Sequence, residues 1–242
     1  MNITIDGLEI FAAPDDTIMQ AAKRADTFIP GLCHGDAVSG NNCCRLCMVE
    51  IEERGRQKLV AACGFKAKEG LIVTTKTERV ARIRKTVLKL MYSQAPENPI
   101  LLELMKKYDV VAEPRLPSKE GQCILCGLCV DACKSLGSSS ISTISRGITK
   151  KVSTPYGEAS DSCIGCGSCV SVCPTKCIEV IDDDAGRTIW NKKFEWARCE
   201  KCGVIVTTKE HYLSSNGPDL PVICPACKRH AITDVFADTL GE

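Results

Sequence analysis

The second half of the chain contains two cysteine-rich stretches, Cys123-Ile-Leu-Cys126-Gly-Leu-Cys129-Val-Asp-Ala-Cys133 and Cys163-Ile-Gly-Cys166-Gly-Ser-Cys169-Val-Ser-Val-Cys173-Pro174. Both follow the spacing C-x2-C-x2-C-x3-C, which is typical of chains that hold a cubane iron–sulfur cluster through four thiolates. Three cysteines at every third position fit one tight loop, and the fourth cysteine starts a helix. The spacing therefore predicts two [4Fe–4S] clusters.

In two-cluster proteins of bacterial ferredoxin type, the fourth cysteine of each stretch binds the cluster of the other stretch, and a proline follows it. This pattern assigns Cys123, Cys126, Cys129 and Cys173 to one [4Fe–4S] cluster, and Cys163, Cys166, Cys169 and Cys133 to the other. Gly127 and Gly167 lack a Cβ, which lets the backbone approach each cluster. We expect a two-cluster ferredoxin domain over residues 116–182, with strands at 141–144 and 178–181. Cys177 is left over and is expected to be a buried packing residue.

The composition favours several small domains that are stabilised by metals. The 242 residues include 18 cysteines, only 5% are aromatic, and the formal net charge is +1. Four metal sites with four thiolates each bring the loaded protein to a charge of about −7, which argues against a nucleic-acid partner. No basic leader sequence is recognisable, and no stretch approaches the roughly 18 apolar residues that cross a bilayer. A cytoplasmic protein without a membrane span is expected.

Residues 1–77 have the pattern of a small α+β domain of β-grasp type. Apolar residues alternate around Asp6-Gly7, a dipeptide typical of hairpin turns, and a second hairpin is expected at 48–61. A short helix up to Ala25 and a strand at 71–74 complete the domain. Its candidate ligands are Cys33, Cys44, Cys47 and Cys63, four thiolates that suit a [2Fe–2S] cluster. Cys43 is surplus and is expected to be a packing residue, and His34 is not needed as a ligand.

Three segments of this domain carry a resemblance to a known family: Ile29-Pro-Gly-Leu-Cys33-His34, Cys44-Arg-Leu-Cys47-Met-Val-Glu50, and Ala62-Cys63 with Gly70-Leu-Ile-Val-Thr74. They resemble the N-terminal [2Fe–2S] domain of the large iron–sulfur subunit of NADH:quinone oxidoreductase. The small diaphorase subunit of NAD-linked hydrogenases, electron-bifurcating ones included, shares that domain. The resemblance implies an electron-transfer subunit in a hetero-oligomeric complex.

Residues 78–115 are expected to be a helical linker. One helix is predicted at 77–92 from apolar residues at helical spacing, and a second starts at Asn98-Pro99 with Asn as N-cap. The basic side chains of the first helix, Arg79, Arg82, Arg84 and Lys85, are expected to face solvent. In the family that the chain resembles, this region carries a further cluster with one His and three Cys ligands. Neither residue type occurs between Cys63 and Cys123, so that cluster is predicted to be absent.

Residues 183–242 contain two further C-x2-C pairs, Cys199 with Cys202 and Cys224 with Cys227. Their separation is typical of a four-cysteine zinc ribbon, with strands expected at 204–208 and 231–236. Iron of rubredoxin type or a further [4Fe–4S] cluster is the alternative. Three aromatic residues precede this ribbon, namely Trp190, Phe194 and Trp196. In one interpretation they cover apolar surface at a subunit contact, and in the other they form the small core of the ribbon itself.

Three iron–sulfur sites in one chain predict a protein that moves electrons one at a time. No G-x-G-x-x-G follows a strand, so no active site of its own is expected on this chain. The resemblance implies a relay between a flavin- and NAD(P)-binding iron–sulfur subunit and a distant catalytic subunit of hydrogenase type, with ferredoxin as a further partner if the flavin subunit bifurcates electrons. The alternatives are the same wiring in a formate dehydrogenase or another NAD(P)-linked complex, a free large soluble ferredoxin, or a regulatory zinc module.

Overall fold

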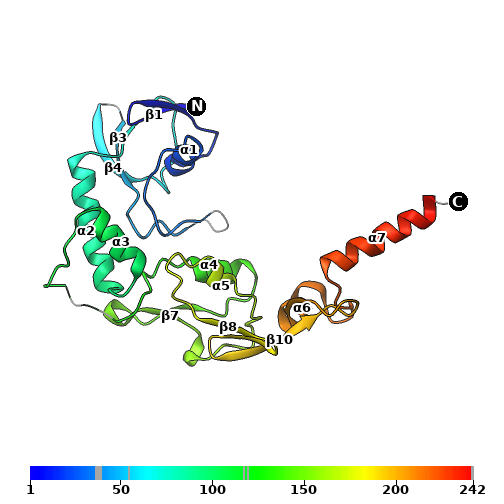
Figure 1. Ribbon diagram of the computed structural model, residues 1–242. Helices are drawn as coiled ribbons and strands as arrows, with labels where there is room; N and C mark the ends of the chain where they lie inside the picture. Colours follow the sequence, from blue (N-terminus) through cyan, green and yellow to red (C-terminus); the bar gives the residue numbers. More distant parts are fainter. Residues whose placement is uncertain (36–39, 54, 117, 119, 241–242) are drawn as a thin grey trace. The chain divides into compact units, whose positions relative to one another are not determined.

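The computed structural model describes residues 1–35, 40–53, 55–116, 118 and 120–240 (Figure 1). Contacts along the chain divide the protein into two compact units. The first contains Met1–Asp131, Thr143–Val152 and Val172–Cys177, and the second contains Ala132–Ser142, Ser153–Ser171 and Ile178–Glu242. Both units combine helices with short strands, which agrees with the predicted α+β class. Within the described part of the chain, no helix is long and apolar enough to cross a membrane.

The first unit begins with a five-stranded sheet in the order β2-β1-β5-β3-β4. The strands are β1 (Asn2–Ile5), β2 (Leu8–Phe11), β3 (Met48–Glu53), β4 (Arg56–Ala61) and β5 (Ile72–Thr74). Both predicted hairpins are confirmed, as β1 with β2 and β3 with β4, while β5 runs parallel to β1. Helix α1 (Ile18–Arg24) contributes to the core of this sheet, and a capping box of Thr17 with Gln20 fixes its start.

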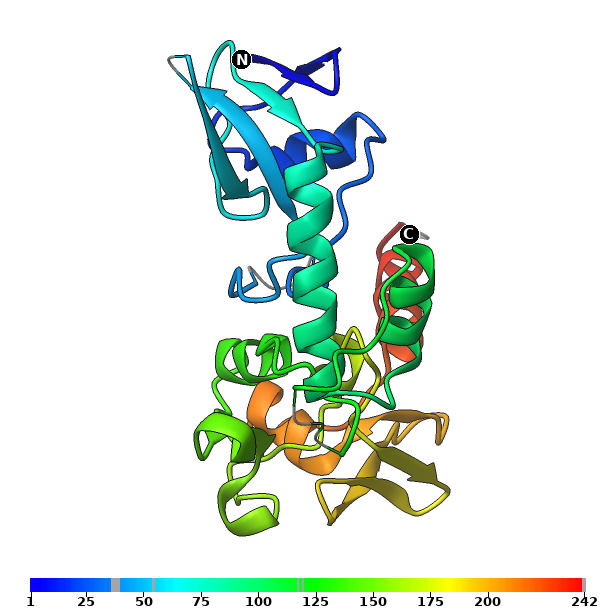
Figure 2. The ribbon, with the colours of Figure 1, turned by 90° about the vertical axis from the view of Figure 1, so that its left-hand side faces the viewer.

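Helices α2 (Glu78–Gln94) and α3 (Pro99–Lys107) follow at the predicted positions. Figure 2 shows α2 as one unbroken helix that leaves the end of the sheet. Asn98 caps α3 through its Oδ1 atom and donates from Nδ2 to the carbonyl oxygen of Gln122 at 3.0 Å. Because the Asn98 side chain is fully buried and satisfied at both ends, it fixes the turn between the two helices.

The prediction that Arg84 faces solvent is wrong. Arg84 is buried on α2 and donates to the carbonyl oxygen atoms of Leu46, at 3.2 Å, and Met48, at 3.0 Å. Burial of a guanidinium costs free energy unless its N–H groups are hydrogen-bonded, and two backbone acceptors at the start of β3 meet that need. The charge pattern of α2 alone did not distinguish this arginine from its neighbours.

The cysteine stretches form short elements. Helices α4 (Leu128–Ser135) and α5 (Ser168–Ser171) start just before the third cysteine of each stretch. The expectation that a helix starts at the fourth cysteine is wrong, because Cys133 lies near the end of α4 and Cys173 follows α5. Strands β6 (Ser142–Ile144) and β7 (Lys151–Ser153) form a two-stranded sheet, and the 3-10 turns η1 (Gly147–Thr149) and η2 (Pro155–Gly157) lie beside it in the sequence. The predicted strand at 141–144 is therefore confirmed as β6, to within one residue.

A four-stranded antiparallel sheet in the order β11-β10-β9-β8 belongs to the second unit. Its strands are β8 (Val180–Asp183), β9 (Gly186–Ile189), β10 (Lys192–Arg198) and β11 (Ile205–Thr208). Helices α6 (Lys209–Asn216) and α7 (Pro225–Leu240) follow. β11 confirms the strand expected at 204–208. The strand expected at 231–236 is wrong, because these residues continue helix α7, which starts at Pro225, although several of them favour strands.

Candidate metal centres

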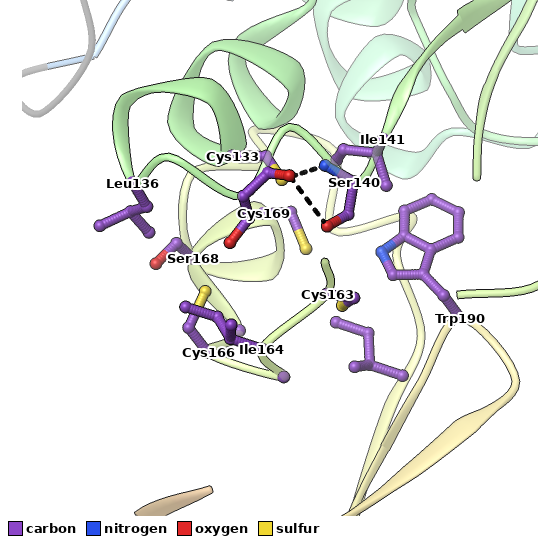
Figure 3. Close-up of a pocket in the computed structure, with 14 residues that line it drawn as sticks. Cys133, Leu136, Ser140, Ile141, Cys163, Ile164, Cys166, Ser168, Cys169 and Trp190 are labelled. Carbon is purple, nitrogen blue, oxygen red and sulfur yellow. Dashed lines mark hydrogen bonds between the residues drawn. The ribbon is translucent and has the colours of Figure 1, made fainter. Parts of the chain in front are cut away.

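Four cysteines of the second unit line one pocket, namely Cys133, Cys163, Cys166 and Cys169 (Figure 3). Cys133 lies on α4 and Cys169 on α5, whereas the other two lie on the loop that precedes α5. These are the four residues that the exchange of fourth cysteines assigned to one [4Fe–4S] cluster. Cys173, which is closer to Cys169 in sequence, belongs to the first unit.

Side chains of the C-terminal sheet pack against the second cysteine loop (residues 163–169). Thr208, at the end of β11, is 0% exposed and donates its hydroxyl to the carbonyl oxygen of Ile164 at 2.6 Å. Phe194 in β10 is fully buried, and a Cβ at Gly165 would lie 2.6 Å from its Cγ atom. Gly165 also has a φ of 63°, so both its backbone and its surroundings favour glycine.

Arg187 in β9 lies against the same loop. Its Nη1 atom donates to the carbonyl oxygen atoms of Gly165, at 3.3 Å, and Cys166, at 3.2 Å. Its Nε and Nη2 atoms each donate to the Asp182 carboxylate at 2.8 Å, and this carboxylate raises the pKa of Arg187 above its ordinary value. A Cβ at Gly167 would lie 2.8 Å from Nη1. The absence of a side chain at Gly167 thus makes room for an arginine, in addition to any approach to a cluster.

The surroundings of these four cysteines suit thiolates that are bound to a metal. The backbone N–H of Ser140 donates to Cys133 Sγ at 3.2 Å. Burial raises the pKa of the Cys169 thiol to about 11, and the side chain of Trp190 acts in the opposite direction. N–H···S hydrogen bonds and burial are two of the contacts through which proteins stabilise iron–sulfur clusters and set their potentials.

The first unit holds the other predicted cubane ligands, Cys123, Cys126, Cys129 and Cys173. Cys126 and Cys129 are buried, and the N–H of Leu125 donates to Cys123 Sγ at 3.4 Å. The pKa of Cys126 is raised, first by burial and then by the thiol of Cys173. The structure thus places Cys173 near the stretch that begins at Cys123, as the exchanged ligation requires.

Cys177 lies beside this second group of thiols. Its Sγ atom is 3.7 Å from Cys173 Sγ, and its hydrogen bond to Cys123 lowers the pKa of Cys123. Cys177 is half-buried, so the prediction of a buried packing residue is wrong. The side chain contacts other cysteines and does not fill an apolar core.

The four cysteines predicted to bind a [2Fe–2S] cluster also lie together. Cys33, Cys44 and Cys47 are buried, and Cys63 is half-buried. The Sγ atoms of Cys47 and Cys63 are 3.2 Å apart, and the Cys44 N–H donates to Cys33 Sγ at 3.4 Å. The neighbouring thiols of Cys43, Cys44 and Cys63 lower the pKa of Cys33. The arrangement offers four sulfur donors, enough for two irons with two thiolates each.

The loop of this site contacts the first cubane site within the same unit. Cys43, expected to be a packing residue, is instead exposed, and its Sγ donates to the carbonyl oxygen of Cys126 at 3.4 Å. Asn41 donates from Nδ2 to the same carbonyl oxygen at 3.3 Å and to the Asp131 carboxylate at 2.6 Å. Gly127 has a φ of 81°, and the Asn41 amide occupies the space of its missing side chain. Sequence reasoning missed Asn41, because nothing local in the sequence indicates its distant partners.

The C-terminal cysteines form a compact group, in which the Sγ atoms of Cys199, Cys202, Cys224 and Cys227 all lie within 4.8 Å of one another. Cys202 Sγ and Cys224 Sγ are 3.7 Å apart, close to the edge of about 3.8 Å in a tetrahedron with metal–sulfur bonds of about 2.3 Å. The Cys224 N–H donates to Cys199 Sγ at 3.3 Å and lowers the pKa of Cys199 to about 6. A cubane separates its thiolates more widely, because an iron lies between each thiolate and the centre. The geometry therefore fits a single tetrahedral ion.

The donor sets fit the groups that the motifs imply. All four candidate centres consist of thiols, the ligands that iron–sulfur clusters and four-cysteine zinc sites use. Backbone N–H groups already point at sulfur in each centre, as at Cys33, Cys123, Cys133 and Cys199. Iron–sulfur clusters, when bound, supply reversible transfer of single electrons, whereas a four-cysteine zinc site supplies structural stability. The fold and its centres thus define an iron–sulfur protein with several centres in one chain.

Comparisons with known proteins agree with this class. A family model described as a 2Fe-2S iron-sulfur cluster binding domain matches residues 1–78, and a model described as a 4Fe-4S dicluster domain matches residues 118–180. The chain therefore carries both domains, and it is homologous to iron–sulfur subunits of NADH-quinone oxidoreductases and NAD(P)-linked hydrogenases.

Three similarities illustrate this relationship. The chain is 32% identical over 200 residues to the NADPH-Fe(3+) oxidoreductase subunit alpha of Geobacter sulfurreducens, covering 72% of this chain and 23% of that subunit. It is 30% identical to the NADP-reducing hydrogenase subunit HndD of Solidesulfovibrio fructosivorans, covering 92% of this chain and 42% of that subunit. A solved NAD+-reducing [NiFe]-hydrogenase chain matches with a TM-score of 0.55 and 28% identity, covering 63% of this chain and 74% of that chain. The chain spans less than half the length of these two curated relatives.

Proposed function

We propose that this protein is an iron–sulfur relay subunit of a multi-subunit oxidoreductase. It passes single electrons between a flavin- and NAD(P)-binding iron–sulfur subunit and a distant redox site, which we assign to a hydrogenase-type subunit. The contact between Cys43 and Cys126 in the first unit carries this proposal. A relay needs neighbouring redox centres that exchange electrons through the protein, and this contact joins the loops of two such centres.

The proposed cofactors are one [2Fe–2S] cluster, two [4Fe–4S] clusters and one zinc ion. Their proposed ligands are Cys33, Cys44, Cys47 and Cys63 for the [2Fe–2S] cluster; Cys123, Cys126, Cys129 and Cys173 for one [4Fe–4S] cluster; Cys163, Cys166, Cys169 and Cys133 for the other; and Cys199, Cys202, Cys224 and Cys227 for zinc. The pocket shared by Cys133 and the second cysteine loop supports the exchanged ligation. The close spacing of the last four sulfur atoms supports a mononuclear site.

The packing of the first unit supports electron transfer between the proposed [2Fe–2S] cluster and the [4Fe–4S] cluster that includes Cys126. Cys33 and Cys44 belong to the same buried cluster of side chains as Cys126. Burial of these cysteines lowers the dielectric response to a moving charge, so an electron crosses between such sites with less rearrangement of solvent. Residues 41–44 would thus do more than complete one binding loop, since they bring it against the next site.

Helix α4 supports electron transfer between the two proposed [4Fe–4S] clusters. It carries Cys129, a proposed ligand of one [4Fe–4S] cluster, and Cys133, a proposed ligand of the other. Four residues along an α-helix advance the chain by about 6 Å. α4 would therefore supply one thiolate ligand to each of the two proposed [4Fe–4S] clusters.

Purification from the native host tests the proposed function. We expect the chain to co-purify with a flavin-containing subunit and a second catalytic subunit, and NAD(P)H added to that complex should reduce the clusters of this chain. The isolated chain provides the matched control, because without the flavin subunit NAD(P)H should leave its clusters oxidised. A stable monomer that reduces partners only in transient encounters would contradict the proposal and favour a free ferredoxin.

A further inference from the structure

Trp190 occupies an unusual backbone position. It forms, with Asn191, the two-residue turn between β9 and β10, in which Ile189 pairs with Lys192. The φ angles of Trp190 and Asn191 are 52° and 60°, which is the type I′ turn that Asn and Gly favour. A bulky side chain at positive φ is strained and persists only when other contacts hold it there. The turn itself gives no reason for a tryptophan.

The surroundings of the Trp190 side chain explain why a tryptophan is found in this turn. It lines the pocket formed by Cys133, Cys163, Cys166 and Cys169, and Figure 3 shows its indole ring beside these cysteines. Its Nε1 atom is buried and has no hydrogen-bond partner among the described residues.

The second tryptophan of the chain provides a contrast. Trp196, in β10, donates from Nε1 to the carbonyl oxygen of Asp183 at 2.7 Å. Indole nitrogen is a donor only, and a buried indole N–H normally finds an acceptor because leaving it unpaired costs free energy. Even Trp196, whose hydrogen bond is exposed to solvent, has a backbone acceptor. Trp190 lines a pocket of four cysteines and three serines, and none of these residues accepts from its N–H, so the missing acceptor is one that a bound cluster would supply.

We propose that Trp190 donates its indole N–H to a sulfur atom of the [4Fe–4S] cluster held by Cys133 and the second cysteine loop, and thereby raises the reduction potential of that cluster. The inference rests on the proposed cluster ligation. Reduction adds one electron and makes the cluster more negative, so a hydrogen bond to sulfur stabilises the reduced form more than the oxidised form. Trp190 would therefore contact the cluster directly. The strain in its turn is tolerated because this backbone conformation directs the indole into the pocket.

Substitution of each tryptophan by phenylalanine tests the proposal. Trp190→Phe keeps an aromatic ring and removes the N–H donor together with part of the ring volume. Trp196→Phe makes the same change elsewhere on the same hairpin and is the matched control. In redox titrations followed by electron paramagnetic resonance, we expect W190F to lower the midpoint potential of one [4Fe–4S] cluster and leave the other unchanged. W196F keeps an aromatic ring beside Arg187 and should shift that cluster much less than W190F does. Unchanged potentials in W190F, or equal shifts of both clusters, would overturn the proposal.

A second measurement does not depend on how well W190F assembles. In W196F protein labelled with indole-15N tryptophan, Trp190 is the sole tryptophan, since the chain has two. Pulsed paramagnetic resonance of the reduced protein should detect a magnetic coupling between this nitrogen and a reduced cluster. Absence of the coupling in protein with a full complement of clusters would refute the hydrogen bond. Absence of the clusters themselves, shown by iron analysis of the wild type, would instead refute the proposed function.

Discussion

The Thr208 hydroxyl donates a 2.6 Å hydrogen bond to the carbonyl oxygen of Ile164 and so ties the end of β11 to the second cysteine loop. Because Thr208 is fully buried and the hydrogen bond is partly buried, Thr208→Val should remove the donor to this carbonyl and lower the free energy of unfolding by about 1–2 kcal/mol. Chemical unfolding followed by cluster absorbance measures this loss. Thr233→Val is the control, since the exposed Thr233 hydroxyl bonds only within α7. Equal effects of both substitutions would contradict the importance of the Ile164 contact.

Substitutions of Arg187 and Asp182 should shift the reduction potential of the [4Fe–4S] cluster at the second cysteine loop in opposite directions. Removal of the cation in Arg187→Gln should make the midpoint potential more negative, because a nearby positive charge favours the reduced cluster. Asp182→Asn leaves the arginine uncompensated and should make the potential more positive. Redox titration distinguishes the two outcomes.

Lys193→Gln supplies the control for this pair. Lys193 in β10 forms an ion pair with Asp183 in β8 of the same sheet, and both side chains are about half exposed. Solvent and salt screen such a charge, so its removal should leave the potential near the wild-type value. Shifts of the same sign in R187Q and D182N would show that loop distortion, and not charge, is the cause.

Exchange of the fourth cysteines predicts which cluster each substitution disturbs. Cys133→Ala should alter the spectrum of the cluster held by the second cysteine loop, because Cys133 lines that pocket. Cys173→Ala should alter the other [4Fe–4S] cluster, because Cys173 lies in the unit that contains Cys123. Paramagnetic resonance of the two reduced clusters separates the effects. Damage confined in each case to the cluster of the nearest sequence neighbours would contradict the exchange.

Metal analysis tests the C-terminal site. The native protein should contain about ten irons and one zinc. Cys202→Ala should lose the zinc and keep all of the iron, since its sulfur belongs to the compact group with Cys224. About fourteen irons without zinc would show a fourth cluster, and about eleven irons would show a rubredoxin-type ion.

Substitution of Arg84 tests the contribution of buried hydrogen bonds to stability at a site that holds no cluster ligand. Arg84→Met keeps the apolar stem but leaves the carbonyl oxygen atoms of Leu46 and Met48 unpaired, which should cost about 2 kcal/mol. Arg82→Met, on the exposed side of the same helix, should change the free energy of unfolding by less than about 0.5 kcal/mol. Denaturant titration of both variants compares the two positions, and equal losses would show that the buried hydrogen bonds contribute little.

Patterns that are local in the sequence predicted most of the fold. The turn dipeptide Asp6-Gly7, the cap Asn98 and the cysteine spacings each act over a few residues, and the elements they indicated are present. Features that depend on distant partners were missed. Arg84 looked like its exposed neighbours, and Trp190 looked like part of a small core or a subunit contact. Both assignments depend on which acceptor or empty space the fold brings near, and no spacing rule contains that information.

The core around the [2Fe–2S] candidate site extends beyond the segment that the first family model matches. Buried side chains from α2, α3 and the first cubane loop, among them Leu88, Leu101 and Cys126, pack in one cluster with Cys33 and Cys44. A boundary at residue 78 therefore cuts through a continuous interior. In any chimaera with a relative, the N-terminal domain should be transferred together with α2, α3 and the loop that contains Cys126. A graft of residues 1–78 alone would lack the buried side chains that pack against its metal site.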